Sequence, residues 1–179
     1  ISFKVKTSLS YVIDIYRLGW YGGSGARKIT TITPTARTQP SCITSAATEI
    51  YDCGNWQVSG TWAVPSTAVS GVYIARLTRN DNGEGSHVPF VVRNDASHSE
   101  LFFQTSDATW QAYNPYGGSN FYQGLANGRA YKLSYNRPFA TRGVVEGRDY
   151  LFSNEFPMLQ FLERNGYSLS YTSGLDVAD

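Results

Sequence analysis

The sequence of 179 residues has few charged side chains and no long apolar segment. Charged residues make up 16% of the chain, below the ~25% typical of soluble domains. The formal net charge is only +1, without long runs of one sign, so neither a nucleic acid nor an anionic membrane surface is an expected partner. No stretch approaches the ~20 consecutive apolar residues of a membrane-spanning helix. These absences exclude electrostatic binding and membrane insertion as the expected functions.

Cysteine and histidine are equally scarce. The sequence has two cysteines, Cys42 and Cys53, and two histidines, His87 and His98. Because a zinc site needs further Cys or His ligands at short spacing, no zinc pattern is present. We expect a disulfide that closes a surface loop, with two free thiols as the alternative. Such a disulfide predicts an oxidising compartment, and therefore a secreted, extracellular protein.

Aromatic residues, in contrast, are abundant at 15% of the chain, and 13 of them are tyrosines. Aromatic faces stack on sugars, and a low charge favours a neutral partner. One hypothesis for the function is therefore an extracellular binding or structural module that recognises a neutral polymer such as a polysaccharide.

The fold class expected from the pattern is a β-sandwich followed by an α/β domain with a parallel sheet. Residues 1–93 show short apolar or alternating runs, separated by turn residues such as Gly22-Gly23, which predicts an antiparallel, Ig-like β-sandwich. The expected strands are residues 2–5, 11–18, 56–64, 71–77 and 88–93. A polar linker is expected at residues 94–99.

Residues 100–179 have the pattern of the α/β domain. The apolar runs at 101–103 and 150–152 are typical of strands buried on both faces. A helix is expected from about Glu155 to Asn165, and a further strand at 167–171 completes a βαβ unit. Because a parallel sheet needs several strands, we expect this domain to be incomplete in these 179 residues. The rest of the polypeptide, as a further segment or a separate chain, is then its partner.

The signals at the ends of this helix are specific. Ser153 or Asn154 is the expected N-cap, and Gly166 is the expected stop. The expected buried side consists of Phe156, Met158, Leu159, Phe161 and Leu162.

Residues 105–122, which follow the first of these strands, are the candidate functional site. Ligands of α/β sheets bind beyond the carboxyl ends of the strands. This segment combines three tyrosyl hydroxyls, a carboxylate and a Gly-Gly pair, and is expected to be a loop. The alternative is a loop that folds its aromatic rings onto the sheet as part of the core. The candidate pocket residues are Asp107, Trp110, Asn114 and, from a second block, Arg137.

Arg137 has two interpretations. It could hold a carboxylate through two parallel hydrogen bonds, or it could form a salt bridge that holds a loop. Four acidic residues, Glu146, Asp149, Glu155 and Glu163, could supply a carboxylate pair for hydrolysis. Glu155 is equally explained by a helix start and Glu163 by a solvent-facing position.

Residues 16–27 are rich in glycine, aromatic residues and arginine. They lack the spacing of a phosphate-binding loop, and no helix pattern follows. A bulged, twisted strand end with stacked aromatic rings and arginines is the expected structure.

Taken together, these blocks resemble the N,N-dimethylformamidase large subunit and the secreted bacterial proteins that share its C-terminal region. The resemblance covers nearly the whole chain in the same order. It rests on IYRLGWYGG at 15–23, GAR at 25–27, GVY at 71–73, TWQAYN at 109–114, Gly117-Gly118, Tyr122, SYNRPF at 134–139 and the block from EFP at 155–157 to Gly166-Tyr167.

The resemblance implies a mononuclear ferric iron, held by two tyrosines and one glutamate, that hydrolyses the C–N bond of a small amide. Hard phenolate and carboxylate oxygens suit such a cation. By position, Tyr113 is the first tyrosine ligand. Tyr122 is the second, with Tyr131 and Tyr135 as alternatives.

The glutamate of the family lies in a Gly-His-Asp-Glu-Tyr-Trp block downstream of the strand at 167–171. The sequence contains no such block, so the third ligand is expected beyond Asp179. The 179 residues alone are then expected to bind iron poorly and to be inactive.

Overall fold

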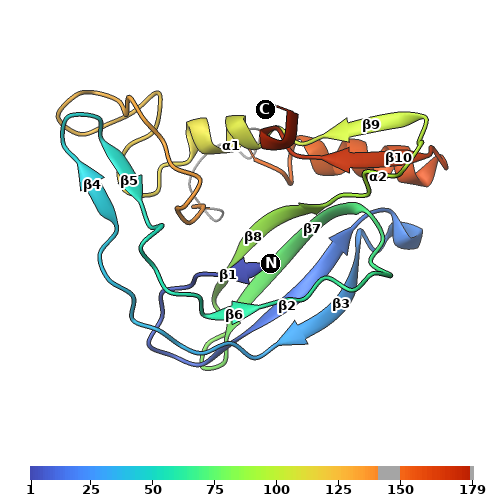
Figure 1. The fold of residues 1–179 in the computed structure, drawn as a ribbon, viewed down its shortest axis with the longest axis horizontal. Helices are drawn as coiled ribbons and strands as arrows, with labels where there is room; N and C mark the ends of the chain where they lie inside the picture. The colour runs from blue at the N-terminus through green and yellow to red at the C-terminus, as the bar shows by residue number, and fades with distance from the viewer. Residues whose placement is uncertain (141–149, 178–179) are drawn as a thin grey trace.

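The computed structural model describes residues 1–140 and 150–177, which are rich in β-strands and contain two α-helices (Figure 1). No helix in this part of the chain is long and apolar enough to cross a membrane. The strands are β1 (Ser2–Phe3), β2 (Tyr11–Leu18), β3 (Ala26–Ile32), β4 (Ile43–Ser45), β5 (Ile50–Asp52), β6 (Gly60–Thr61), β7 (Gly71–Arg79), β8 (Gly85–Val92), β9 (Leu101–Gln104) and β10 (Leu169–Thr172). The helices are α1 (Asp107–Tyr113) and α2 (Glu155–Arg164), with short 3-10 turns at Tyr21–Gly23 and Leu175–Val177.

A four-stranded antiparallel sheet in the order β3-β2-β7-β8 forms one layer of the molecule. Strand β2 shows the expected period of two, because every second side chain from Tyr11 to Ile15 is buried. The pairing of β2 with β3 shifts register between Ile15 and Tyr16, so the expected bulge is present. Strand β3 itself was not expected from the sequence, since its exposed edge position leaves it without a clear apolar face.

A two-stranded sheet, β1 with β6, lies across one face of this layer. The strand expected at 56–64 is reduced to Gly60–Thr61. The expected start of the strand lies in a turn, in which the Trp56 N–H donates to the Cys53 carbonyl at 3.0 Å, and the Ser59 N–H donates to the Phe3 carbonyl of β1 at 2.8 Å. The core between the two sheets contains Phe3, Tyr11, Ile13, Ile15, Trp62, Tyr73, Ala75 and Leu77. The Ig-like form of this half stays a prediction.

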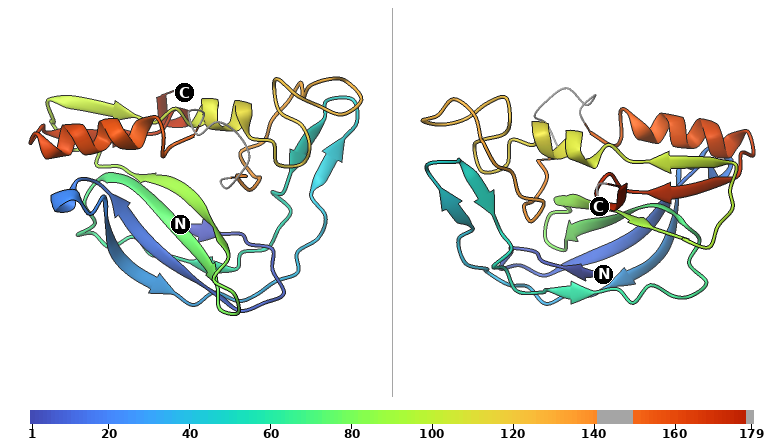
Figure 2. Two further views of the ribbon diagram at one scale, coloured as in Figure 1. Left: turned by 180° about the vertical axis from the view of Figure 1, so that it is seen from behind. Right: turned by 45° about the horizontal axis from the view of Figure 1, so that its top comes forward.

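The opposite face of the four-stranded sheet is covered by β9, β10 and the two helices (Figure 2). A second core joins residues from both layers: Leu18, Val72, Ile74, Phe103, Trp110, Leu151, Leu159 and Tyr171. Strand β7 is therefore buried on both faces and lies at the centre of the molecule. Residues 94–99 form a turn between the layers, and their role as a domain boundary stays a prediction.

Strands β9 and β10 are parallel, with Leu101 opposite Leu169, and both helices lie between them in sequence. The expectation that residues 101–103 are buried on both faces is wrong. Phe102 is 64% exposed, because no described element covers the outer face of this two-stranded sheet. The strand expected at 150–152 is also wrong. These residues form a turn whose Leu151 is fully buried, and an apolar run alone does not distinguish a strand from a buried turn.

Helix α2 lies within a residue or so of its expected bounds. Gly166 has a φ of 76°, the left-handed conformation that ends many helices. Asn154 occupies the N-cap position, although its side chain makes no capping hydrogen bond. Leu159 is fully buried, but Met158 and Phe161 are more than half exposed, which corrects their expected burial. Only one side of the helix meets the core.

Candidate functional site

The segment 105–122 begins with a helix rather than a loop, because α1 occupies Asp107–Tyr113. It follows β9 directly, so it lies at the carboxyl end of a parallel strand, where ligands of α/β sheets bind. Asp107 is in the first turn of α1, where a negative charge is favourable. The segment from Asn114 onward is irregular, as expected.

Asp107 connects the ends of both parallel strands. Its carboxylate accepts hydrogen bonds from the Thr105 hydroxyl after β9 (2.9 Å), the backbone N–H of Gly174 after β10 and the Tyr135 hydroxyl (3.0 Å). Burial, together with the hydrogen bond and charge of Asp107, raises the pKa of Tyr135 to about 12. Asp107 is buried, and Tyr135 remains protonated as its donor.

Tyr113 and Tyr122 lie side by side. Their ring centroids are 4.4 Å apart and the ring planes are 20° from parallel. Tyr113 is at the last position of α1 and partly buried, whereas Tyr122 is 60% exposed. The structure therefore brings together the two tyrosines that were expected to bind metal.

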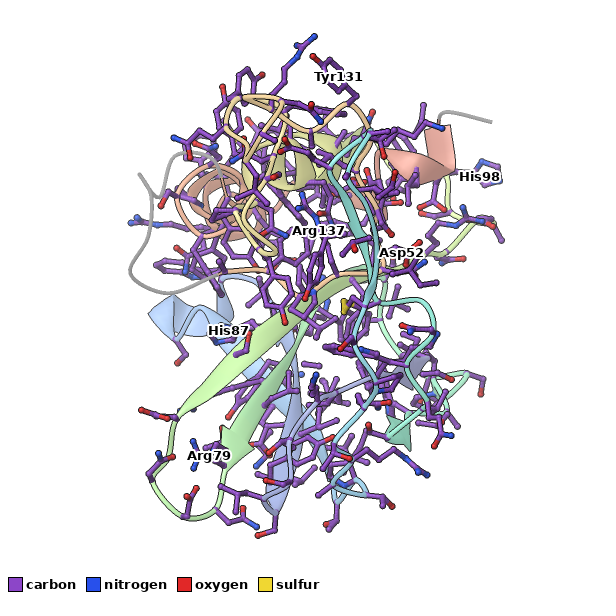
Figure 3. The ribbon with its side chains drawn as sticks, turned by 90° about the vertical axis from the view of Figure 1, so that its left-hand side faces the viewer. Asp52, Arg79, His87, His98, Tyr131 and Arg137 are labelled. Atoms are coloured by element: carbon purple, nitrogen blue, oxygen red, sulfur yellow. A yellow bond between two sulfur atoms is a disulfide. The ribbon has the colours of Figure 1, made fainter. Side chains whose placement is uncertain are left out.

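The two alternative tyrosines are placed differently. Tyr131 lies at the outer end of the molecule, with the Arg129 guanidinium 5.1 Å from its ring centroid (Figure 3). Tyr135 donates its hydroxyl to Asp107, as described above. Neither has a ring contact with Tyr113 or Tyr122 among the described contacts.

Arg137 lies in the interior, with a carbonyl partner for each of its nitrogens (Figure 3). It donates to the backbone oxygens of Gln111 (2.7 Å), Tyr116 (3.0 Å) and Ser119 (3.0 Å), and to the Gln111 side-chain oxygen (3.2 Å). Burial lowers its pKa to about 10. Arg137 holds a loop, as one interpretation expected, but it does so through carbonyl oxygens and not through a salt bridge to any described acid.

Trp110 and Asn114, the other pocket candidates, are also buried. Trp110 donates its indole N–H to Glu155 Oε1 at 2.9 Å, and Asn114 donates to the Pro138 carbonyl at 2.9 Å. Two open cavities in the described part of the chain lie elsewhere, one of about 590 Å³ beside Arg93 and Phe102 and one of about 310 Å³ beside Arg17. The four pocket candidates bond to protein groups around them, and none of the four lines either of these two cavities.

The four acidic residues that could supply a carboxylate pair are only partly described. Glu146 and Asp149 lie outside the described residues. Glu155 Oε1 accepts from the Ser106 backbone N–H and from Trp110, so it ties the starts of the two helices together. No group of three or more His, Cys, Asp or Glu side chains in residues 1–140 and 150–177 could hold a metal ion.

Glu163 corrects the expectation of a solvent-facing residue. Its carboxylate forms a 2.7 Å ion pair with Arg17 and accepts from the Trp20 backbone N–H (3.0 Å) and the Tyr171 hydroxyl (2.8 Å). Burial alone would lower the pKa of the Arg17 guanidinium, but the hydrogen bond and charge of Glu163 raise it above its ordinary value. This cluster joins β2 to α2 and β10.

The block at residues 16–27 has the stacked arrangement expected for it. The Arg27 guanidinium lies 4.6 Å from the ring centroid of Tyr21, and the Arg164 guanidinium lies 5.0 Å from that of Trp20. In the sequence, the arginines and aromatic residues of this block are the only indication of the arrangement. No local pattern indicates that Glu163 binds Arg17 and the Trp20 N–H.

The predicted disulfide between Cys42 and Cys53 is confirmed, with a Cα–Cα distance of 4.3 Å. It closes the β4–β5 hairpin at its base. Glu49, near the tip of this hairpin, is a further residue of the site, and no sequence pattern indicates it. Its carboxylate is buried against the loop that carries Tyr122.

Comparison with known proteins bears directly on this site. The family model for the N,N-dimethylformamidase beta subunit-like, C-terminal region matches residues 12–179, nearly the whole chain and every residue of the candidate site. A comparison with curated proteins found no match. On the extent of the family match, the chain belongs to the N,N-dimethylformamidase beta subunit-like, C-terminal family.

Proposed function

We propose that this chain is part of an iron-dependent hydrolase that cleaves the C–N bond of a small, non-peptide amide. Family membership supports a relationship to such hydrolases. The observation that carries the proposal is the stacked pair of Tyr113 and Tyr122, with ring centroids 4.4 Å apart. In this proposal, the oxygens of these two neighbouring phenols bind the same ion.

The donor chemistry fits ferric iron. Phenolate oxygens are hard ligands, and hard ligands suit a hard cation. A free tyrosine ionises near pH ~10, so binding at neutral pH requires the cation to displace the phenol proton. The third ligand in this proposal is a glutamate from outside these 179 residues, which alone would bind iron weakly and have no activity. When bound, the iron would polarise the amide carbonyl and acidify a water molecule.

The residues around the pair orient both tyrosines. The Asn120 side chain, which is buried, donates to the Tyr113 carbonyl at 3.1 Å and accepts from the Tyr122 backbone N–H at 2.8 Å. The Phe121 N–H donates to the Ala112 carbonyl at 3.1 Å. The chain after α1 thus folds back on the end of the helix, and Asn120 connects the two tyrosine backbones.

The test uses the polypeptide extended past Asp179. After loading with ferric iron, we expect a visible tyrosinate-to-iron absorption band and release of amine from a small amide. Tyr113→Phe and Tyr122→Phe should each remove the band, whereas Tyr131→Phe should retain it. Tyr167→Phe, an exposed tyrosine beyond α2, is the matched control. A colourless, metal-free extended protein would refute the proposal, and loss of the band in Tyr131→Phe would refute the choice of Tyr122.

A second candidate function is recognition of a neutral polymer such as a polysaccharide. The observation that favours it is a set of exposed apolar side chains on one loop: Phe121, Tyr122, Leu125 and Tyr131. The Cys42–Cys53 disulfide supports an oxidising, extracellular location for either function. Glycan-array binding by the 179 residues, lost in Tyr122→Ala and Tyr131→Ala, would favour this candidate. An array without hits would refute it.

A further inference from the structure

The disulfide-closed hairpin of β4 and β5 extends away from the four-stranded sheet and lies beside the loop of residues 114–136 (Figure 1). Figure 2 shows the same contact from two other sides. Glu49, next to the tip, has a φ of 53°, a left-handed conformation that is uncommon for a residue with a side chain. Strained backbone of this kind persists only where surrounding contacts hold it.

The Glu49 carboxylate supplies such contacts. It accepts hydrogen bonds from the Ser119 hydroxyl (2.6 Å) and from the backbone N–H groups of Leu125 (2.7 Å) and Asn127 (2.5 Å). The hydrogen bond from the Ser119 hydroxyl contributes most to holding the pKa of Glu49 below its ordinary value, and the hydrogen bonds from the two amides add to this effect. Hydrogen bonds to an ionised acceptor are roughly twice as strong as neutral ones. One carboxylate on the hairpin therefore ties down three points of the loop.

Further bonds run along the whole hairpin. The Tyr131 N–H donates to the Thr48 carbonyl at 2.9 Å, and the Asn127 side chain donates to the Ala46 carbonyl at 2.7 Å. At the base, the Cys53 N–H donates to the Asn136 carbonyl at 2.6 Å. The disulfide thus braces an element that bonds to the loop near its tip and at its base.

Glu49 is connected to the tyrosine pair through two residues that are neighbours in sequence. Ser119, which donates to Glu49, precedes Asn120, which bonds to both Tyr113 and Tyr122. We propose that Glu49 is a positioning residue, and that the hairpin holds the loop so that Tyr122 stacks on Tyr113. The importance of this stack for metal binding rests on the proposed function. The anchoring of the loop by Glu49 does not.

The experiment compares Glu49→Gln with wild type in the 179-residue chain, by backbone hydrogen exchange at neutral pH. Gln keeps the size of Glu but replaces one accepting oxygen with an NH₂ group that faces a donor. Since hydrogen bonds to a charged group are the stronger ones, exchange at Leu125 and Asn127 should rise by about tenfold or more. If Glu49 positions the pair, exchange at Tyr122 should rise with them. Amides of β7 should be unchanged, and Glu100→Gln, on an exposed acid, is the matched control.

Each result decides the proposal. Faster exchange at Leu125 and Asn127 with a protected Tyr122 would show that Glu49 anchors only its own contacts, which overturns the positioning role. Unchanged exchange at all three would overturn the anchoring as well. If Glu49→Gln unfolds and β7 exchanges too, the milder Ser119→Ala variant, which removes one of the three donors, is read at Tyr122 in the same way.

The iron band of the extended protein separates this inference from the proposed function. If Glu49→Gln weakens the band and speeds exchange at Tyr122, both stand. If the wild-type extended protein binds no iron while Tyr122 still responds to Glu49→Gln, the proposed function fails and the positioning role stands.

Discussion

The ion pair between Arg17 and Glu163 joins the two layers of the molecule, and its removal should destabilise the whole fold. Arg17 is on β2, Glu163 is on α2, and their side chains are 9% and 17% exposed. The change is Glu163→Gln, which keeps the side-chain size and creates no cavity. It leaves the Arg17 guanidinium buried without its counter-charge and weakens the acceptor of the Trp20 N–H and the Tyr171 hydroxyl.

Breaking a buried ion pair by removing one partner costs about 3–5 kcal/mol. The Ser70 and Leu18 carbonyls still accept from Arg17, and Glu163 is partly exposed, so we expect about 2–3 kcal/mol here, between the buried and exposed classes. With a urea dependence of about 2 kcal/mol per molar, the unfolding midpoint should fall by about 1–1.5 M.

The assay is equilibrium unfolding in urea, followed by tryptophan fluorescence and circular dichroism. Arg17→Met, measured alone and together with Glu163→Gln, completes a double-mutant cycle. Two residues in direct contact should show a coupling free energy of about 0.5–3 kcal/mol. Asp95→Asn is the control, because Asp95 pairs with Arg93 at an exposed position and its loss should leave the midpoint unchanged. If Glu163→Gln lowers the free energy of unfolding by less than about 1 kcal/mol, the pair contributes no more than an exposed ion pair. That result would refute a stabilising role for the Arg17–Glu163 pair between the layers.

Two further predictions concern the hairpin. Replacing both Cys42 and Cys53 by Ser should lower the free energy of unfolding by about 3 kcal/mol in the loop-entropy relation, since the cysteines are 11 residues apart; a urea midpoint that is insensitive to reduction would contradict it. Acidification should release the loop. The folded pKa of Glu49 lies below its ordinary value of 4.5, so its stabilisation is complete above that value and is lost as the pH falls through the folded pKa. The donors are a hydroxyl and two amides, which do not titrate. In wild type, hydrogen exchange at Leu125, corrected for intrinsic rates, should therefore become faster below pH 4.5. This increase should be absent in Glu49→Gln. The same increase in the variant would contradict the assignment of the pH dependence to Glu49.

Local patterns accounted for the regular parts of the fold. The alternation along residues 11–18 and 71–77 predicted β2 and the first part of β7, because successive side chains of a strand point to opposite faces. Gly166 marked the end of α2 because a left-handed residue stops a helix at little cost to glycine. The disulfide was one of two interpretations of the two cysteines, and their Cα–Cα distance of 4.3 Å decided between them.

Local patterns failed where tertiary packing overrides propensity. Helix α1 is seven residues long and contains threonine, tryptophan and tyrosine, which are modest helix formers, so its sequence predicts a loop. Residues 150–152 and Phe102 are apolar in the same way, yet Leu151 is fully buried in a turn and Phe102 is exposed on a strand. Only the position of each segment against its neighbours separates the two outcomes.

The sequence by itself determined the β-rich character, the bounds of the strongest elements and the family, because these depend on periodicity, on residue type or on motifs read along the chain. It also singled out the tyrosines of the candidate site. The tertiary structure alone decided which polar groups meet. Glu163 pairs with a residue 146 positions away, and Glu49 bonds to groups 70 to 78 positions away. A carboxylate carries no local mark of such a partner, since the bond forms only when the packing of distant elements brings donor and acceptor within about 3 Å in a site that excludes water.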